Sequence, residues 1–463
     1  MKRILQIALL LGCGYAWGAE VQIAGDRMAV LNGNRTFVLG LYENPKEDSA
    51  LDQVAAAGFN LVQSDGTAEA LDRLGKRGLY SWVNTGATID LSDDTENRTA
   101  ALRALVTGVA AKHPALFCWE VPDEALWNVW YGAELWRLAE QKQHRELIAA
   151  LTDEAARKEV QSLRDEADKL FANAYYKESE DKALAVWEKL GKTSPNPELR
   201  ISNAPVRAAK MRDGMLAGYR LMKELDPIHP VWMNHAPRNQ IEQLAAFNEA
   251  ADAVGCDIYP INEFKGGHSD LVDRSMTSVG AFTRRMQAAA PGKPVWMVLQ
   301  GFGWHDIGND KEDTTLRRPN LSELRFMCFD TIVHGARGIL FWGTAFIEKD
   351  SQLWSDVMTT IRELADLQPV LSAPDATLTP AVTYDQTWGS LEKGVFVLPK
   401  DVDGKLHLIV VNEELIPLRL HIGNLPGGVT SFTNTMTGEP VAVEHGIATL
   451  HLPRRGIALL RQG

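Results

Sequence analysis

Cysteine is scarce in this chain of 463 residues, with only four present. Cys118, Cys256 and Cys328 each lie in an apolar run and lack the spacing of metal ligands. An odd number of such residues argues against a disulfide framework, so we expect three buried free thiols. The fourth, Cys13, belongs to the N-terminal segment described below.

Other chemical signatures are missing as well. No Gly-x-Ser-x-Gly elbow is present, which argues against a serine hydrolase. No His/Cys/Asp cluster has metal-ligand spacing, so we expect no metal or cofactor. Lys and Arg number 48 against 60 Asp and Glu, for a net charge of -12. Because an acidic surface repels phosphate backbones, we do not expect a nucleic-acid partner.

The first 19 residues have the pattern of a signal peptide. Lys2 and Arg3 precede an apolar run over residues 4–11, too short to span a membrane, and small residues follow. Residues 16–18 suit ordinary cleavage, whereas residues 10–13 loosely resemble a bacterial lipobox, which would attach a lipid to Cys13. No later stretch reaches the ~18 apolar residues of a transmembrane segment. We therefore expect an exported bacterial protein, either periplasmic, secreted or held at the outer surface as a lipoprotein.

Eight short apolar runs alternate with segments of helical length. This rhythm predicts repeated βα units that close into a (β/α)8 barrel over residues 20–372. An open doubly wound sheet is the competing architecture, but it would carry a Gly-rich phosphate loop after an early strand, and none is present. The runs are residues 37–41, 60–63, 79–84, 115–120, 230–234, 253–259, 294–299 and 338–342.

Two regions depart from the barrel rhythm. Residues ~127–200 are highly charged with heptad-like apolar positions, which predicts a helical hairpin inserted after the fourth strand. It is either a solvated decoration or, since loops at this face of a barrel build active sites, a wall of a cleft through Trp127, Trp130 and Tyr131. Residues 373–463 carry alternating strands and turn signals, which predict an antiparallel β-sandwich. A sandwich by itself indicates no function.

Polar and aromatic residues at the ends of the eight runs are the expected site, because barrel active sites lie at the carboxyl ends of the strands. Amides and acids pair with hydroxyl groups in both donor and acceptor senses, which suits a polyhydroxylated ligand such as a carbohydrate. We expect binding roles for Glu120, Asn84, Trp82, Asn234, His235, Tyr259, Gln300, Trp304 and Trp342.

The strongest segment runs from Phe117 to Glu124, where an apolar strand leads abruptly into three acids. Their mutual repulsion near a low-dielectric wall would raise the pKa of at least one, as a general acid requires. Alternatively, Asp123 and Glu124 are first-turn acids that cap the following helix.

This segment resembles the "W-x-x-x-D-E-P" segment of barrel glycoside hydrolases of the large retaining clan A. The resemblance implies a glycosidase, in which Glu124 is the acid/base; Ala125 stands where that segment has Pro. Residues 257–260 add further similarity, and residues 318–342 are similar to the last helix–strand unit of bacterial glycosidase-like proteins.

The seventh run departs from the clan pattern, because Gln300 stands where the nucleophilic Glu is expected. An amide is a very poor nucleophile. The second carboxylate then comes from elsewhere, with Asp257 and Glu43 as candidates, or the substrate assists its own cleavage, or the protein binds glycans without hydrolysing them. Our leading hypothesis is a glycoside hydrolase; the alternatives are a non-catalytic glycan-binding barrel and a structural surface lipoprotein.

Overall fold

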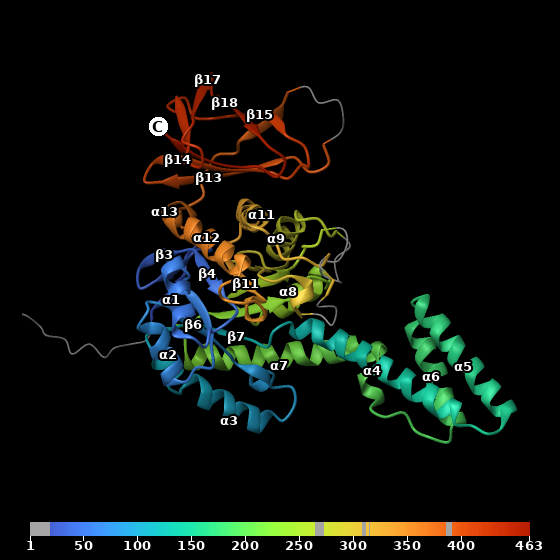
Figure 1. The fold of residues 1–463 in the computed structure, drawn as a ribbon. Coiled ribbons are helices and arrows are strands. Elements are labelled where there is room, and N and C mark those ends of the chain that lie inside the picture. The colour runs from blue at the N-terminus through green and yellow to red at the C-terminus, as the bar shows by residue number, and fades with distance from the viewer. Residues whose placement is uncertain (1–18, 264–272, 308–311, 314, 386–390) are drawn as a thin grey trace, which may run out of the picture.

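A closed barrel of eight parallel strands forms the centre of the protein (Figure 1). The computed structural model describes residues 19–263, 273–307, 312–313, 315–385 and 391–463, so the signal-peptide residues 1–18, including Cys13, lie outside the described residues. Each of the eight predicted runs is a strand, which confirms the barrel. In order around it they are β4 (Val38–Leu41), β5 (Leu61–Ser64), β6 (Tyr80–Asn84), β7 (Leu116–Glu120), β8 (Val231–His235), β9 (Ala253–Ile258), β10 (Trp296–Gln300) and β11 (Gly338–Trp342).

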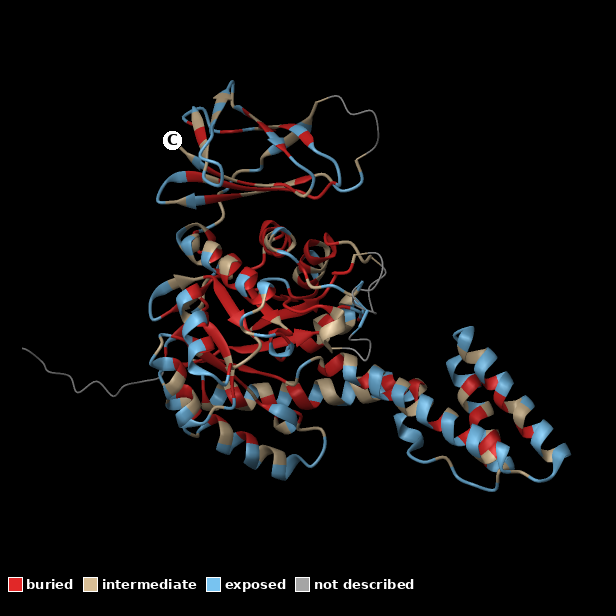
Figure 2. Ribbon diagram, in the orientation of Figure 1, coloured by how far each residue is buried: buried red, intermediate tan, exposed pale blue. Residues whose placement is uncertain are grey.

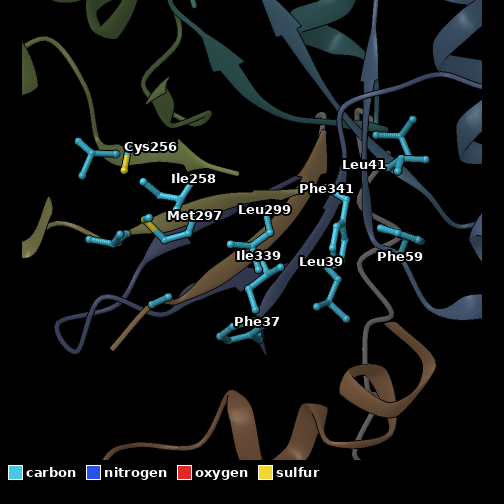
Figure 3. Packing of buried hydrophobic residues seen from close by; sticks show 14 of the residues in the cluster. Phe37, Leu39, Leu41, Phe59, Cys256, Ile258, Met297, Leu299, Ile339 and Phe341 are labelled. Carbon is cyan, nitrogen blue, oxygen red and sulfur yellow. The ribbon is translucent and has the colours of Figure 1, made fainter. Parts of the chain in front are cut away.

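Side chains alternate between the two faces of the barrel strands. Leu39, Met297 and Ile339 lie on the outer face, in the layer between strands and helices (Figure 3). Trp82 and Trp232 belong to the inner cluster and meet edge to face at 5.6 Å between ring centroids. The surrounding helices are α1 (Asp48–Ala57), α2 (Ala68–Gly75), α3 (Thr95–Val106), α7 (Ala204–Leu225), α8 (Ile241–Asn248), α9 (Ser278–Ala289), α11 (Leu321–Val333) and α12 (Gln352–Asp366).

A small antiparallel sheet precedes the barrel. It consists of β1 (Val21–Ile23), β2 (Ala29–Leu31) and β3 (Asn34–Thr36). Its apolar residues belong to the same buried cluster as the inner residues Val38 and Leu61. Because Val38 and Leu61 begin their strands, this sheet packs at the amino end of the barrel and leaves the carboxyl end for the site.

A helical insertion follows the fourth strand, as predicted, but it is an arm of three helices and not a hairpin of two. α4 (Ala125–Ala149) extends away from the barrel, and α5 (Glu154–Ala172) and α6 (Tyr176–Lys189) pack side by side at its far end (Figure 1). Much of the arm is exposed (Figure 2), with a small core of Ile148, Val160 and Val186. The chain returns through short 3-10 turns to α7, which packs beside α3.

The C-terminal region contains eight antiparallel strands in two layers, as predicted, with β13 and β14 nearest the barrel helix α11 (Figure 1). The strands are β12 (Ala381–Tyr384), β13 (Val395–Val402), β14 (Lys405–Asn412), β15 (Leu418–Gly423), β16 (Ser431–Asn434), β17 (Pro440–Glu444), β18 (Ile447–Leu452) and β19 (Ile457–Gln462).

Cys118, Cys256 and Cys328 are buried free thiols, as predicted. Among the residues that the structure describes, no helix has the length and apolar character that crossing a membrane would require.

Candidate active site

Glu120, the last residue of β7, is fully buried at the carboxyl end of the barrel. It accepts hydrogen bonds from the Tyr42 hydroxyl, from Trp82 Nε1 at 3.0 Å and from Asn84 Nδ2 at 2.8 Å. Burial and the negative charge of Asp123 raise the pKa of Glu120 to about 8, although the three donors oppose the shift. At neutral pH the buried carboxyl group of Glu120 therefore keeps its proton.

Glu124 stands at the start of α4 with φ of 50°, in the left-handed region that residues with a side chain rarely adopt. It occupies the N-cap position, yet its side chain makes no capping hydrogen bond. Its backbone N–H donates to the carbonyl oxygen of Asn234 at 3.2 Å, and its side chain is hydrogen-bonded with Asp257. The local backbone thus directs this carboxyl group across the mouth of the barrel and not onto the helix.

Asp257, near the end of β9, is the partner of Glu124 and is 3% exposed. Burial and then the charge of Asp123 raise the pKa of Asp257 to about 7, against the hydrogen bonds from Glu124 and Asn234. Two carboxyl groups in hydrogen-bonding contact share a proton, because both cannot ionise at such a distance. The Glu124–Asp257 pair is therefore an acid and a base held together.

Asn234 joins this pair to a third carboxyl group. Its Nδ2 donates to Asp257 Oδ1 at 3.2 Å and to Asp123 Oδ1 at 2.9 Å. Asp123 is solvent-exposed, yet desolvation at the barrel mouth raises its pKa, while the bonds from Asn234 and the Glu124 backbone oppose the shift. Asp123, Glu124 and Asp257, held by strands β7 to β9, form one connected group that we call the carboxyl cluster.

Aromatic rings stand beside the cluster. Tyr259 stacks on Trp342, with 5.3 Å between ring centroids and 20° between planes. Phe302 and Trp304 pack edge to face against each other and against Tyr259. Trp304 and Trp342 keep partial exposure, so both offer ring surface at the mouth. Trp82, in contrast, is fully buried beneath Glu120.

A cavity of about 740 Å³ opens on the side of strands β5 and β6. It is lined by Asn84, which also binds Glu120, and by side chains that include Asn44, Gln63, Asp65 and Arg73. This size and this polar lining suit a small polyhydroxylated ligand.

Three predicted site residues are directed elsewhere. Glu43 pairs with Lys349 Nζ at 2.7 Å and accepts from Thr344 Oγ1 at 2.6 Å. His235 is buried on the outer face of β8, with its Nε2 2.8 Å from Asn248 Oδ1 of α8. Gln300 is fully buried, and its amide exchanges two hydrogen bonds with the backbone of Ile261, at 2.8 and 2.7 Å. The amide of Gln300 thus holds the loop after β9.

Tyr42 is a site residue that the sequence reasoning missed. It follows β4 directly, and its hydroxyl donates to Glu120. Burial and the charges of Asp123 and Glu120 raise its pKa well above the ordinary value. Side chains alternate along β4, and Val38 belongs to the inner cluster. The same alternation places Tyr42 on the inner face and Glu43 on the outer face, so it is the signal that could have predicted Tyr42.

Among the described residues, one group of His and carboxylate side chains is compact enough to hold a metal ion. Asp330, His334 and Glu413 have ligand atoms within 4.8 Å of one another. The group lies where α11 meets the C-terminal strands, and Arg284 Nη1 approaches His334 Nδ1 to 2.7 Å. A guanidinium cation therefore already occupies the space beside the ring.

The closed parallel barrel followed by a C-terminal antiparallel domain is a fold that glycoside hydrolases also have. The chain is similar to the β-galactosidase of Bacillus circulans sp. alkalophilus, with a TM-score of 0.51 and 10% identity over 92% of this chain and 99% of that one.

Two further structures give the same fold. A catalytic mutant of a GH42 β-galactosidase from G. stearothermophilus has a TM-score of 0.52 and 10% identity, covering 92% of this chain and 98% of its own. A family 5 glycoside hydrolase from Bacteroides vulgatus has a TM-score of 0.52 and 12% identity, covering 96% and 93%. No protein-family model matches the chain, and no curated protein matches it. At these identities the likeness establishes the fold alone.

Proposed function

We propose that the protein is a glycoside hydrolase in which Glu124 is the general acid and Asp257 the general base. The observation that carries the proposal is the hydrogen-bonded Glu124–Asp257 pair at the barrel mouth, with the pKa of Asp257 raised to about 7. Glycosidic cleavage needs one protonated and one ionised carboxyl group, and a pair that shares one proton supplies both near neutral pH.

The proposed reaction is a single displacement. Glu124 gives its proton to the glycosidic oxygen as the bond to the anomeric carbon breaks, and the leaving alcohol departs with that proton. A water molecule attacks the anomeric carbon and loses its own proton to Asp257. The carboxyl groups are ordinarily about 5–5.5 Å apart in retaining enzymes and about 6.5–9.5 Å in inverting ones, so the contacting pair must separate when substrate enters.

Other parts of the mouth support a saccharide substrate. Trp304 and Trp342 offer ring faces to the apolar side of a sugar, and Asn84 and Asp123 can bind hydroxyl groups. The N-terminal segment supports the further proposal that the protein works outside the cytoplasm, where polymeric saccharides occur.

Comparison of Glu124→Gln and Asp257→Asn with the wild type on aryl glycosides and oligosaccharides tests the proposal. Loss of a general acid or base lowers kcat/KM by about 10²–10⁴-fold. We expect Glu124→Gln to lose least on aryl glycosides with an acidic phenol, since such a leaving group departs without a proton. Glu96→Gln, on the exposed first turn of α3, is the matched control and should keep full activity. Undiminished turnover by Glu124→Gln would remove the assignment.

A non-catalytic glycan-binding protein is the second candidate function. It is favoured by Gln300, whose amide is fully committed to backbone groups at the strand end where clan A enzymes carry their nucleophile. Saccharide binding by the wild type without turnover of any substrate would favour this candidate.

A further inference from the structure

A second cavity, of about 430 Å³, lies between the base of the arm and the loop that follows β8. We call it the arm cavity. From α4 it is lined by Trp127, Trp130 and Glu134, whose spacing places them on one face of the helix. Tyr176, the first residue of α6, also lines it and is 38% exposed. The insertion therefore adds an aromatic-lined cavity to the barrel.

Asn239 provides a polar group that the protein itself does not satisfy. It lines the arm cavity, is 5% exposed, and its Nδ2 has no hydrogen-bond partner among the described residues. Its own carbonyl oxygen accepts from Arg285, which holds the backbone in place. A buried amide donor without an acceptor is costly, so the position favours a ligand that brings an oxygen.

The charges around the arm cavity balance. Arg238 and Glu134 contribute one charge of each sign, and the remaining polar lining residues are Asn239, Gln240 and Gln243. Arg238 lies over the ring of Trp127, 5.4 Å from its centroid, so Trp130 and Tyr176 are the aromatic side chains left to face a ligand. Together with the amide groups and no net charge, they suit an uncharged sugar ring, which presents apolar C–H faces and hydroxyl groups. A uronic acid or sulfated sugar would bring an anionic charge into a lining that already holds one charge of each sign.

The position of the arm cavity relates it to the carboxyl cluster. Glu124 begins α4, and the helical rise of 1.5 Å per residue places Trp127 ~4.5 Å, Trp130 ~9 Å and Glu134 ~15 Å further along the axis. The cavity beside Asn84 lies across the mouth, on strands β5 and β6. The two cavities therefore flank the carboxyl cluster from different sides, and the arm cavity is the one that α4 connects to the proton donor.

We propose that the arm cavity binds uncharged hexose units on the leaving-group side of the scissile bond. The inference rests on the proposed function, because Glu124, as the proton donor, defines which side of the scissile bond is the leaving-group side. It assigns to the arm the role of recognising the oligosaccharide beyond the bond that is cut.

Two measurements on the full-length protein test the inference. Isothermal titration of Glu124→Gln with neutral gluco-, manno- and galacto-oligosaccharides, and with an oligogalacturonate, reports binding without turnover. Adding Trp130→Ala or Asn239→Ala should raise the Kd of the neutral ligand roughly tenfold. In the otherwise wild-type enzyme, the same changes should raise KM for the oligosaccharide and leave its kcat unchanged. Tyr175→Ala, 57% exposed and outside the cavity, is the control.

The outcomes separate this inference from the proposed function. Neutral ligands that bind, weaken with both variants and are never hydrolysed would support the arm cavity as a sugar site and remove the hydrolase. Hydrolysis of oligosaccharides with KM unchanged in both variants would overturn the arm cavity alone. Absence of neutral-sugar binding, or tighter binding of oligogalacturonate, would also overturn it. If circular dichroism shows that Trp130→Ala does not fold, the smaller change Asn239→Ala decides.

Discussion

Glu120 makes the stability of the protein depend on pH. The Glu120 carboxyl group keeps its proton in the folded state up to a pKa of about 8, whereas in the unfolded chain it releases the proton near the ordinary value of 4.5. The stabilisation is therefore fully present below pH 4.5 and is lost as the pH rises through 8. Glu120→Gln mimics the protonated form, because its carbonyl oxygen can accept from Trp82 and Asn84 while its NH2 faces the Tyr42 hydroxyl.

We expect the free energy of unfolding to fall less between pH 5 and pH 8 in Glu120→Gln than in the wild type. The difference should be on the order of a few kcal/mol, since each unit of pKa shift corresponds to about 1.4 kcal/mol. Urea denaturation at the two pH values measures it, with Glu96→Gln as the exposed control. An equal fall in the free energy of unfolding between pH 5 and pH 8 in Glu120→Gln and the wild type would contradict the raised pKa of Glu120.

The sequence located the carboxyl groups of the site better than it located their neighbours. Glu120, Glu124 and Asp257 follow from their place at strand ends, and all three lie at the carboxyl end of the barrel. Which neighbours face inward depends on strand phase: Asn234 lies inside the barrel, so His235 must lie outside. The contact between Glu124 and Asp257 could not be predicted, because it depends on the left-handed backbone at Glu124 and on strand register.

At the scale of the element, the arm is held by a buried ion pair. Glu140 of α4 is 5% exposed and accepts from Trp187 Nε1 at 2.7 Å and from Arg200 Nη2 at 3.3 Å. His144 lies in the same interior, where burial and the charges of Arg164 and Arg200 lower its pKa to about 4. The arm thus depends on polar partners as much as on its small apolar core.

We expect Glu140→Ala to destabilise the arm by about 3–5 kcal/mol, because Arg200 would remain buried without its carboxylate. Hydrogen exchange should then accelerate in α5 and α6 and stay unchanged in β8 and β9. Glu159→Ala, which breaks the exposed pair with Lys189, should cost no more than about 1 kcal/mol. Equal acceleration in the barrel strands would mean that the arm does not unfold as a separate unit.

For the whole molecule, Asp375 ties the barrel to the C-terminal strands. Its carboxylate meets Arg337 Nη2 at 2.5 Å and Lys400 Nζ at 2.9 Å, and these two cations are only 3% and 1% exposed. Burial raises the pKa of Asp375, but the charges of Arg337 and Lys400 outweigh it and hold the pKa below the ordinary value.

Asp375→Ala should therefore lower the free energy of unfolding by about 3–5 kcal/mol and split the calorimetric transition into two. Asp385→Ala is the matched control, because Asp385 pairs with Arg419 and His421 at an exposed position within the C-terminal strands. A single, unshifted transition in Asp375→Ala would show that other contacts hold the barrel and the C-terminal strands together.

The architecture of the whole chain was predictable because its signals are repeated. Eight apolar runs at regular spacing leave few alternatives to a barrel, and the change of periodicity near residue 373 marks the second fold. Strands β12, β16 and β17 carry little signal in the sequence, since each has only four or five residues and few are buried. Such strands are specified by their neighbours and not by their own pattern.

The left-handed backbone at Glu124 lowers the stability of the fold at a position whose carboxyl group the proposed function requires. Glycine or asparagine would adopt that conformation at less cost, and either would also relieve the crowding of three carboxyl groups. A search for a more thermostable protein that ignored activity would therefore replace this residue early. The position marks a compromise between the most stable sequence for this barrel and one that can transfer a proton.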